Sequence, residues 1–413
     1  MGANKVVTFL RKYMMLIATV IVVIAFYFIT GGKTLYPMNI DSLISQNAYV
    51  FVLGTGMLLC ILTGGNIDLS VGSVVCLAGG VGAMMMYNWR MPWFVAVIAM
   101  LVMGLLVGLW HGFWIAYVKV PPFIATLVGM LAFRGLANII MGGFAIPVED
   151  KTFLNLFGGG DSCYVPDFLN FIAPDSGLNV TCMAAGIAIA VGYVIFTFVN
   201  RSRLIAKGYK VESLGAVIVK TVLIVAVVVW FSYKLAGYKG IPTALIWIAL
   251  ILGIFAYITT KTTLGRNLYA VGGNEKATRL SGIDTRKVMF SAYTLMGVLS
   301  GFAGIVNIAR LQGSTPTYGV GYEMDAIAAC FIGGASAYGG TGSIGGVIIG
   351  AALMGIINQG MSIADTPVNY QKVVKGIVLI VAVLFDVIMQ MRRKGAKKKA
   401  TSSVSSEKGG AQS

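Results

Sequence analysis

The chain has 413 residues, of which 57% are hydrophobic and only 11% are charged. No soluble globular domain of this size has such a composition, so that class of protein is excluded. Repeated apolar runs of about 18 residues or more predict an all-α, polytopic membrane protein. The net charge of +16 does not indicate a nucleic-acid partner, because Lys and Arg concentrate at particular ends of the apolar runs.

About twelve apolar segments follow one another, and their basic flanks predict a topology. With the N-terminus in the cytoplasm, most of the 31 Lys and Arg residues fall on cytoplasmic ends. By the positive-inside rule both termini are then cytoplasmic. The segments are 13–30, 43–63, 70–87, 93–118, 123–143, 179–200, 214–233, 242–260, 288–308, 324–340, 344–361 and 371–390.

This topology divides the chain into three parts. A short basic leader (1–12) lies at the cytoplasmic surface of the membrane, and a transmembrane domain (13–391) follows it. The tail (392–413) begins with basic residues suited to anionic lipid and ends in a Ser- and Gly-rich stretch that we expect to be disordered. The outer loop 144–178 is acidic, which suits either a solvated loop or a surface for an extracytoplasmic partner.

Polar residues in the first half of the transmembrane domain are candidates for a solute path. Asn47 lies inside an apolar segment, where a polar group is expected to face the protein interior. The glycine-rich stretch 63–73 contains Asn66, Asp68 and Ser70. Asp68 and Ser70 either cap the following helix or line a path for a polar solute, and Asn66 is a further candidate for the path.

The fifth segment begins after Pro121 and carries Thr126 and Arg134 on related faces. An arginine near the middle of a membrane is unfavourable unless it is paired or hydrated. Arg134 therefore either pairs with a carboxylate or with helix-end carbonyls, or it contacts the solute. The sequence does not decide between these roles.

Similar features recur in the second half. The ninth segment contains small residues that predict close helix packing, namely Gly297, Gly301 and Gly304. Asn307 is a further candidate for the path. Glu323 and Asp325 open the next segment, where acids suit either a helix start or the path. The acidic start of this segment and its glycine-rich end resemble residues 68–80. This similarity suggests an internal duplication.

The polar loop 261–287 separates two apolar segments and carries six basic residues. It contains the signature of a two-turn helix, with a cap, an acid at the start, a base at the end and a left-handed stop: Asn274, Glu275, Arg279 and Gly282. Ala277 and Leu280 share a face. Because so short a helix is unstable alone in water, the loop is either a solvated connection or a docking helix for a soluble partner.

Four ordered motifs make the chain similar to the permease subunits of bacterial monosaccharide ABC importers of the ribose/xylose/galactose type. The similarity extends from about residue 10 to residue 390, over a family core of about ten spans. The motifs are Gly65–Ser73 (GNIDLSVGS), Phe123–Leu127 (FIATL), Tyr269–Ile283 (YAVGGNEKATRLSGI) and Gly321–Ala329 (GYEMDAIAA).

The resemblance implies a division of tasks among subunits. Two permease chains form the path as a homodimer. A cytosolic ATPase binds ATP and Mg²⁺. An extracytoplasmic sugar-binding protein delivers the substrate. Gly272–Ile283 would be the coupling loop that docks on the ATPase, through Gly272, Gly273, Asn274, Glu275, Ala277, Arg279, Leu280 and Gly282. Relative to the general coupling motif of ABC permeases, Gly282 lies seven residues beyond the glutamate rather than six.

Residues 201–240 depart from the shorter family members, which pass almost directly from the segment after the outer loop to the coupling loop. Either this stretch adds an inserted pair of spans, or part of it lies at the membrane surface. The longer form resembles the xylose or multiple-sugar branch, which favours pentoses and aldohexoses as substrates.

The primary interpretation is therefore a permease subunit of the bacterial inner membrane. The sequence has no G-x-x-x-x-G-K-[ST] motif, so we expect neither an enzyme nor a cofactor bound by this chain. The alternative is a secondary sugar transporter driven by an ion gradient. It would need buried carboxylates within segments, whereas most acids here lie in loops or at segment ends.

Overall fold

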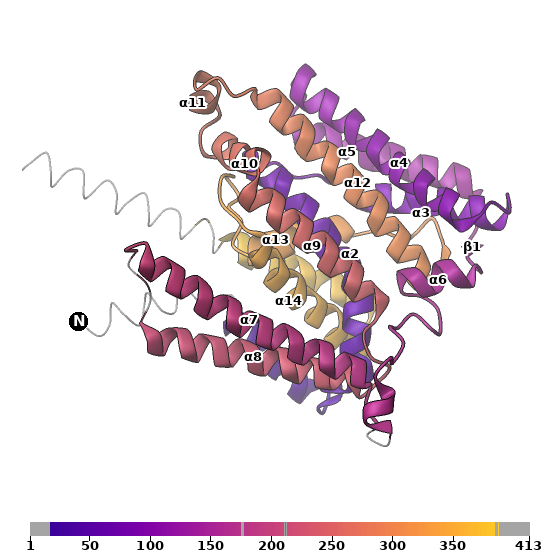
Figure 1. Cartoon of the computed structure of the whole chain (residues 1–413). Coiled ribbons are helices and arrows are strands. Elements are labelled where there is room, and N and C mark those ends of the chain that lie inside the picture. Colours follow the sequence, from indigo (N-terminus) through magenta and orange to yellow (C-terminus); the bar gives the residue numbers. More distant parts are fainter. Residues whose placement is uncertain (1–16, 175–176, 210, 212, 385–386, 388–413) are drawn as a thin grey trace, which may run out of the picture.

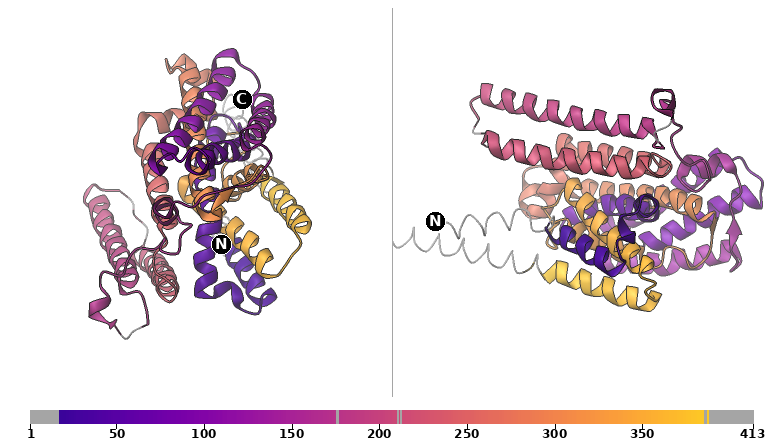
Figure 2. Two further views of the ribbon diagram at one scale, coloured as in Figure 1. Left: turned by 90° about the vertical axis from the view of Figure 1, so that its right-hand side faces the viewer. Right: turned by 90° about the horizontal axis from the view of Figure 1, so that it is seen from below.

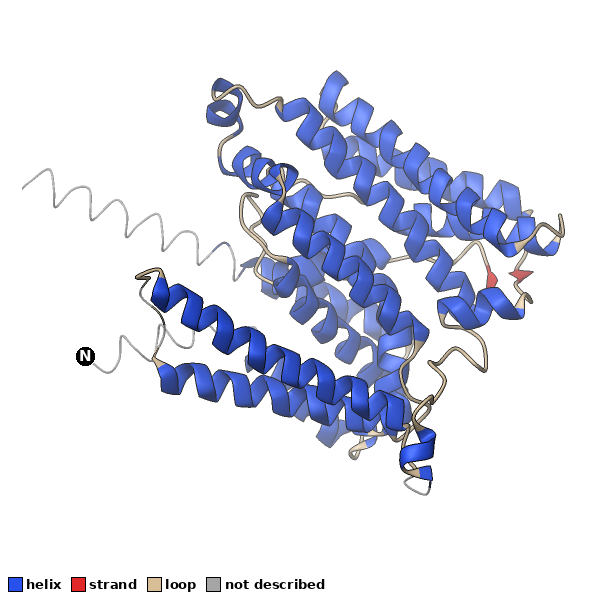
Figure 3. Ribbon diagram, viewed as in Figure 1, coloured by secondary structure: helices blue, strands red, loops and turns tan. Residues whose placement is uncertain are grey.

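The structure, a computed structural model, describes residues 17–174, 177–209, 211, 213–384 and 387. It is mainly helical, as predicted (Figure 3). The leader 1–12 and the tail 392–413 lie outside the described residues. Eight described helices are long and apolar enough to cross a membrane: α2 (Pro37–Leu62), α4 continued by the π-helical turn η2 (Trp93–Gly112 and Phe113–Val118), α5 (Pro122–Met141), α7 (Val180–Ala206), α8 (Leu214–Ala236), α9 (Thr243–Lys261), α12 (Thr285–Leu311) and α14 (Ile344–Ile363).

The predicted count of twelve spans is not confirmed, because several apolar segments form shorter helices. Segment 324–340 is helical only over α13 (Tyr322–Ile332), and the glycine-rich stretch that follows has several residues with positive φ. Segment 70–87 forms α3 (Val71–Tyr87). Further helical elements are Ile17–Ile29, η1 (Lys33–Leu35), α6 (Lys151–Phe157), η3 (Asn170–Ile172), α10 (Thr263–Gly273), α11 (Glu275–Leu280) and residues 368–384.

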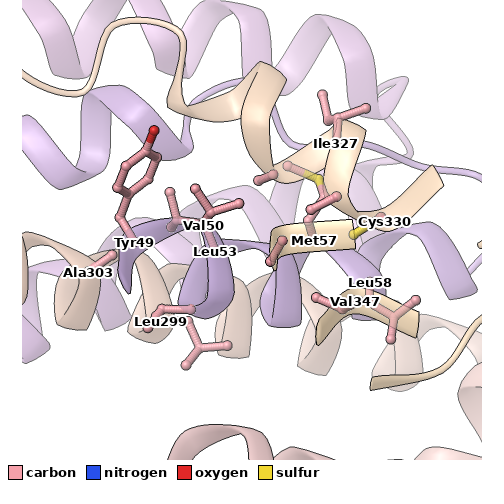
Figure 4. Packing of buried hydrophobic residues seen from close by; sticks show 14 of the residues in the cluster. Tyr49, Val50, Leu53, Met57, Leu58, Leu299, Ala303, Ile327, Cys330 and Val347 are labelled. Atoms are coloured by element: carbon pink, nitrogen blue, oxygen red, sulfur yellow. The ribbon is translucent and has the colours of Figure 1, made fainter. Parts of the chain in front are cut away.

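Helix α2 is the centre of the bundle. It begins with Pro37, whose fixed φ suits the first turn of a helix, and most of its length is buried. Its side chains pack mainly against α12, α13 and α14, and also against α9. Figure 4 shows this packing between residues of α2, α12, α13 and α14, including Tyr49, Leu53, Met57, Leu299, Ala303, Ile327, Cys330 and Val347.

Glycines bring α4 and α12 into backbone contact, as the sequence predicted for the ninth segment. A methyl group placed on Gly297 would lie 2.3 Å from the carbonyl oxygen of Gly104. One placed on Gly301 would lie 2.6 Å from the carbonyl oxygen of Met100. The two helices therefore approach more closely than any larger residue at these positions would permit.

The two short helices α3 and α13 face each other with their N-termini. A methyl group on Gly72 would lie 2.0 Å from the carbonyl oxygen of Gly319, and one on Gly319 would lie 2.1 Å from that of Gly72. Each short helix follows a long helix through a non-helical loop, α3 after α2 and α13 after α12. Leu62 ends α2 at the same end of the bundle at which Thr285 begins α12 (Figure 1). The two helix–loop–short-helix units therefore run in opposite directions, which supports an inverted duplication.

Helices α7 and α8 form a hairpin at the side of the bundle (Figure 2). Only 17% of the apolar window of α7 and 6% of that of α8 is buried. Residues 201–240 supply the last turns of α7, the turn and α8. Both helices are long and apolar enough to span a membrane, but only α8 lies wholly within residues 201–240, so an inserted pair of spans in this stretch stays a prediction.

Polar segments gather at opposite ends of the bundle. The C-terminus of α7 and the N-terminus of α8 lie at the same end as α10 and α11, whereas α6 and the short strand β1 (Ile146–Pro147) lie at the other end (Figure 1). There β1 pairs antiparallel with β2 (Gly313–Ser314). The loops that the sequence assigned to opposite sides of the membrane are thus separated by the length of the bundle.

Candidate functional site

The N-terminus of α3 is surrounded by acidic groups. A methyl group on Gly72 would lie 2.7 Å from Oε2 of Glu323, so this carboxylate reaches the first turn of α3. Asp68 accepts hydrogen bonds from the backbone N–H of Ser70 at 2.8 Å and from its hydroxyl at 2.6 Å. Negative charge is favourable at a helix N-terminus. Asp68 bonds only Ser70, the residue just before α3, so its contacts form a local turn and do not cap an N–H of the helix, while Glu323 of α13 reaches the first turn of α3.

Arg134 holds the turn that leads into α13. Its guanidinium donates to the carbonyl oxygens of Pro316 (3.2 Å) and Tyr318. Of the two roles that the sequence left open, the structure therefore shows pairing with carbonyls. Thr126 donates to the carbonyl of Pro122 within its own helix at 2.9 Å and is fully buried, so its place in a path stays a prediction.

A buried polar cluster lies at mid-depth of the bundle. Asp325 accepts hydrogen bonds from Tyr49, which is at the middle of α2, at 2.5 Å and from the ammonium group of Lys375 at 2.9 Å. Asn358 donates to Asp325 at 3.5 Å and to Asn47 at 3.2 Å. Although Asp325 stands at a helix start, as predicted, that start is inside the protein. The residue is 0% exposed, so this acid at a segment end is a buried one, and its place in a path stays a prediction.

The sequence reasoning did not identify Tyr49, Lys375 and Asn358 as members of this cluster. Lys375 carried a usable signal, because it is a charged residue within the last apolar segment, where charges are rare and paired. Tyr49 carried no such signal, since tyrosine is common in apolar helices.

An aromatic pair links this cluster to Asn307. The rings of Tyr49 and Tyr322 stack with their centroids 3.6 Å apart. The hydroxyl of Tyr322 donates to Oδ1 of Asn307 at 2.8 Å. Three predicted path residues, Asn47, Asn307 and Asp325, are therefore brought together through residues that the sequence analysis did not name.

The predicted short helix in the polar loop is present as α11. Its N-cap is Asn274, which accepts from the N–H of Ala277 at 2.9 Å, and Gly282 has a φ of +83° just beyond its end. Glu275 accepts a hydrogen bond from the hydroxyl of Thr285 at 3.2 Å. Leu280 is 82% exposed, so an apolar side chain of this helix has no cover within the described chain.

A cavity of about 710 Å³ lies beneath α11. It brings the predicted coupling residues Glu275 and Arg279 next to the predicted path residue Asn66. Lys119 and Arg286 add positive charge to its wall. Asn66 is thus separated from the Asp325 cluster and belongs to this end of the bundle.

The base of the polar loop touches both loops that flank the short helices. A methyl group on Gly272 would lie 1.8 Å from the carbonyl oxygen of Leu62, at the end of α2, and 2.4 Å from the N–H nitrogen of Gly340, beyond α13. The hydroxyl of Tyr269 donates to the carbonyl of Gly342 at 2.9 Å. Burial raises the pKa of Tyr269, so this hydroxyl stays protonated and remains a donor. Gly273, in contrast, faces open space.

Comparisons with known proteins agree with this arrangement. A family model described as the branched-chain amino acid transport system / permease component matches residues 39–383. The chain is 37% identical over 377 residues to the xylose transport system permease protein XylH of Haemophilus influenzae, with 91% of this chain and 96% of the relative covered.

Two further relatives have similar coverage. The XylH protein of Escherichia coli K12 is 36% identical over 379 residues, covering 91% of this chain and 92% of its own length. The ribose import permease protein RbsC of Escherichia coli K12 is 33% identical over 349 residues, covering 84% and 85%. No solved structure matches the chain. The chain therefore belongs to the family of permease subunits of ABC sugar importers, which are multi-pass proteins of the inner membrane.

Proposed function

We propose that this permease subunit forms the translocation path of an ATP-driven importer whose substrate is a pentose of the xylose type. Relatives named for xylose transport share 36–37% identity with the chain, and those named for ribose import share 31–33%. A neutral sugar requires hydrogen-bonding groups along its path, which Asn47, Asn66 and Asn307 supply. Ser70, Thr126 and the charged residues remain further candidates.

The observation that carries the proposal is the backbone junction at Gly272. The polar loop, residues 261–287, projects α11 away from the bundle and contacts at its base both loops that flank α3 and α13. Because backbone atoms touch there without intervening side chains, a displacement of α11 by a partner passes directly to the two short helices. Their facing N-termini would then separate or close.

The partners follow from the family and from the two ends of the bundle. Permeases of ABC importers work with an ATPase and a substrate-binding protein. We place the ATPase, with its ATP and Mg²⁺, on α11, and the binding protein on the opposite end, which includes the loop 144–178. We also propose a homodimer with both termini in the cytoplasm, with 1–12 and 392–413 flanking the transmembrane domain 13–391.

The alternative, a secondary transporter, gains one feature from the structure, the buried carboxylate of Asp325. This carboxylate is paired with Lys375 at 2.9 Å, as charged groups inside membrane proteins usually are, so its burial does not by itself indicate an ion-driven transporter. The family membership and the exposed docking helix both favour the ABC importer.

The test is uptake of labelled xylose into vesicles that contain the chain with its ATPase and binding protein. We expect uptake to require ATP on the side of the vesicle membrane that carries the ATPase. Collapsing the proton and sodium gradients should leave uptake unchanged. Unlabelled ribose, galactose and xylose as competitors establish the sugar preference. Uptake driven by an ion gradient without the ATPase would contradict the proposal.

A further inference from the structure

The hairpin α7–α8 contains two adjoining hollows near its basic turn. The first, of about 310 Å³, lies between the two helices, and its lining combines the apolar residues Leu204, Val211 and Val217 with the polar and basic residues Tyr193, Thr197, Asn200, Arg201, Lys220 and Thr221. Its two cations come from different helices, Arg201 from α7 and Lys220 from α8. The pair therefore presents positive charge from both sides of one small space.

The second hollow is an apolar groove of about 440 Å³. It is lined by Val194 and Phe198 of α7 and by valines and an alanine of α8, including Val222 and Ala226. Thr221 lines both hollows, so the basic chamber and the apolar groove share a wall. Together they have the two-part character of a phospholipid, with a charged head next to an apolar chain.

Thr221 gives an independent indication of a ligand. The residue is only 5% exposed, and its hydroxyl has no hydrogen-bond partner among the described residues. A buried hydroxyl without a hydrogen-bond partner is unfavourable, so such groups are rarely left unpaired. An oxygen of a bound head group in the first hollow would satisfy it.

We propose that the hairpin binds one anionic phospholipid, with its phosphate held by Arg201 and Lys220 and an acyl chain in the apolar groove. Lys220 lies six residues after the start of α8, roughly 9 Å along the helix, so its flexible side chain reaches toward the membrane surface. Basic pockets between membrane helices at the cytoplasmic side suit anionic head groups. That this lipid belongs to the cytoplasmic leaflet rests on the proposed orientation of the chain. The binding of the lipid to the hairpin does not depend on that orientation.

A lipid fits this site better than a soluble anion. The helices that form it are largely uncovered by the rest of the chain, so lipid reaches the groove directly from the surrounding bilayer. A free phosphate would leave the apolar groove empty. A zwitterionic lipid would bring a positive group next to two cations.

The test uses the purified, delipidated full chain and measures bound lipid by native mass spectrometry during titration with phosphatidylglycerol or phosphatidylcholine. We expect one phosphatidylglycerol to bind at least about tenfold more tightly than phosphatidylcholine, since roughly 1 kcal/mol is available from each basic residue. The double variant Arg201→Gln/Lys220→Gln should bind phosphatidylglycerol roughly 30-fold more weakly. The matched control Arg203→Gln/Lys207→Gln removes two exposed charges from the same turn that line neither hollow. It should retain most of the affinity.

A second variant tests the groove without changing any charge. Ala226→Trp fills the apolar groove from an exposed position of α8, so it should abolish tight lipid binding while the helical content stays unchanged. The proposal would be overturned if Arg201→Gln/Lys220→Gln and Arg203→Gln/Lys207→Gln lost the same affinity for phosphatidylglycerol. Wild-type lipid binding by Ala226→Trp would also overturn it, as would displacement of the lipid by millimolar inorganic phosphate, because a free anion would then be the ligand.

Discussion

Replacing Lys375 by Met leaves the carboxylate of Asp325 buried without its cation. The two charged groups are 2.9 Å apart, and their side chains are 23% and 1% exposed. At an effective dielectric constant of ~20, a pair at this distance attracts by about 6 kcal/mol, and the desolvation of both groups offsets much of this attraction. Removing one partner of a buried pair is nevertheless destabilising by about 3–5 kcal/mol, because the other charge is left uncompensated. We expect this loss for Lys375→Met.

The assay is unfolding of the purified chain in mixed micelles, followed by tryptophan fluorescence. The double variant Asp325→Asn/Lys375→Met carries no charge at the site, so it should recover most of the lost stability. Lys372→Met, on an exposed position of the same helix, should change the free energy of unfolding by less than about 0.5 kcal/mol. The single variant Asp325→Asn completes the comparison. If the double variant lost as much stability as Asp325→Asn and Lys375→Met lose together, the pair would not act as a unit and the reasoning would be refuted.

Three further predictions concern coupling and the turn before α13. Glu275→Arg should abolish sugar uptake while ATP hydrolysis and helical content persist; wild-type uptake would contradict a docking role. Gly272→Ala places a methyl group 1.8 Å from the carbonyl oxygen of Leu62, so uptake should fall at least about tenfold. Gly273→Ala, which faces open space, is its control and should transport normally. Arg134→Met leaves two carbonyls without their donor and should lower the free energy of unfolding by about 1–3 kcal/mol, and full stability in a denaturant titration would count against the pairing.

Much of the coupling loop could be predicted from the sequence, because its determinants are local. The cap at Asn274, the acid that follows it and the stop at Gly282 act within a few residues of one another, and the structure contains the resulting helix. The ordered motifs likewise predicted the family. The roles of the individual coupling residues remain predictions.

The number of spans was harder to predict, since apolar composition does not distinguish a crossing helix from a short helix followed by a loop. Segment 324–340 is mostly apolar or glycine, with Asp325 near its start, yet α13 ends at Ile332. The positive φ of Gly334 and of later glycines in this stretch directs the chain away from a helix. Such a break is visible in the sequence only as a cluster of glycines.

Composition and local sequence patterns are enough to show that the chain is a helical membrane protein, which loops are basic, and where a short helix forms between two apolar segments. These properties depend on composition and on neighbours along the chain. The contact of Tyr49 and Lys375 with Asp325 could be seen only once the helices were packed, because these residues come from α2, residues 368–384 and α13. The same holds for the facing of α3 and α13 and for the contact of Gly272 with both of their loops. Contacts between residues so far apart in sequence arise from the packing of whole helices, which no local pattern records.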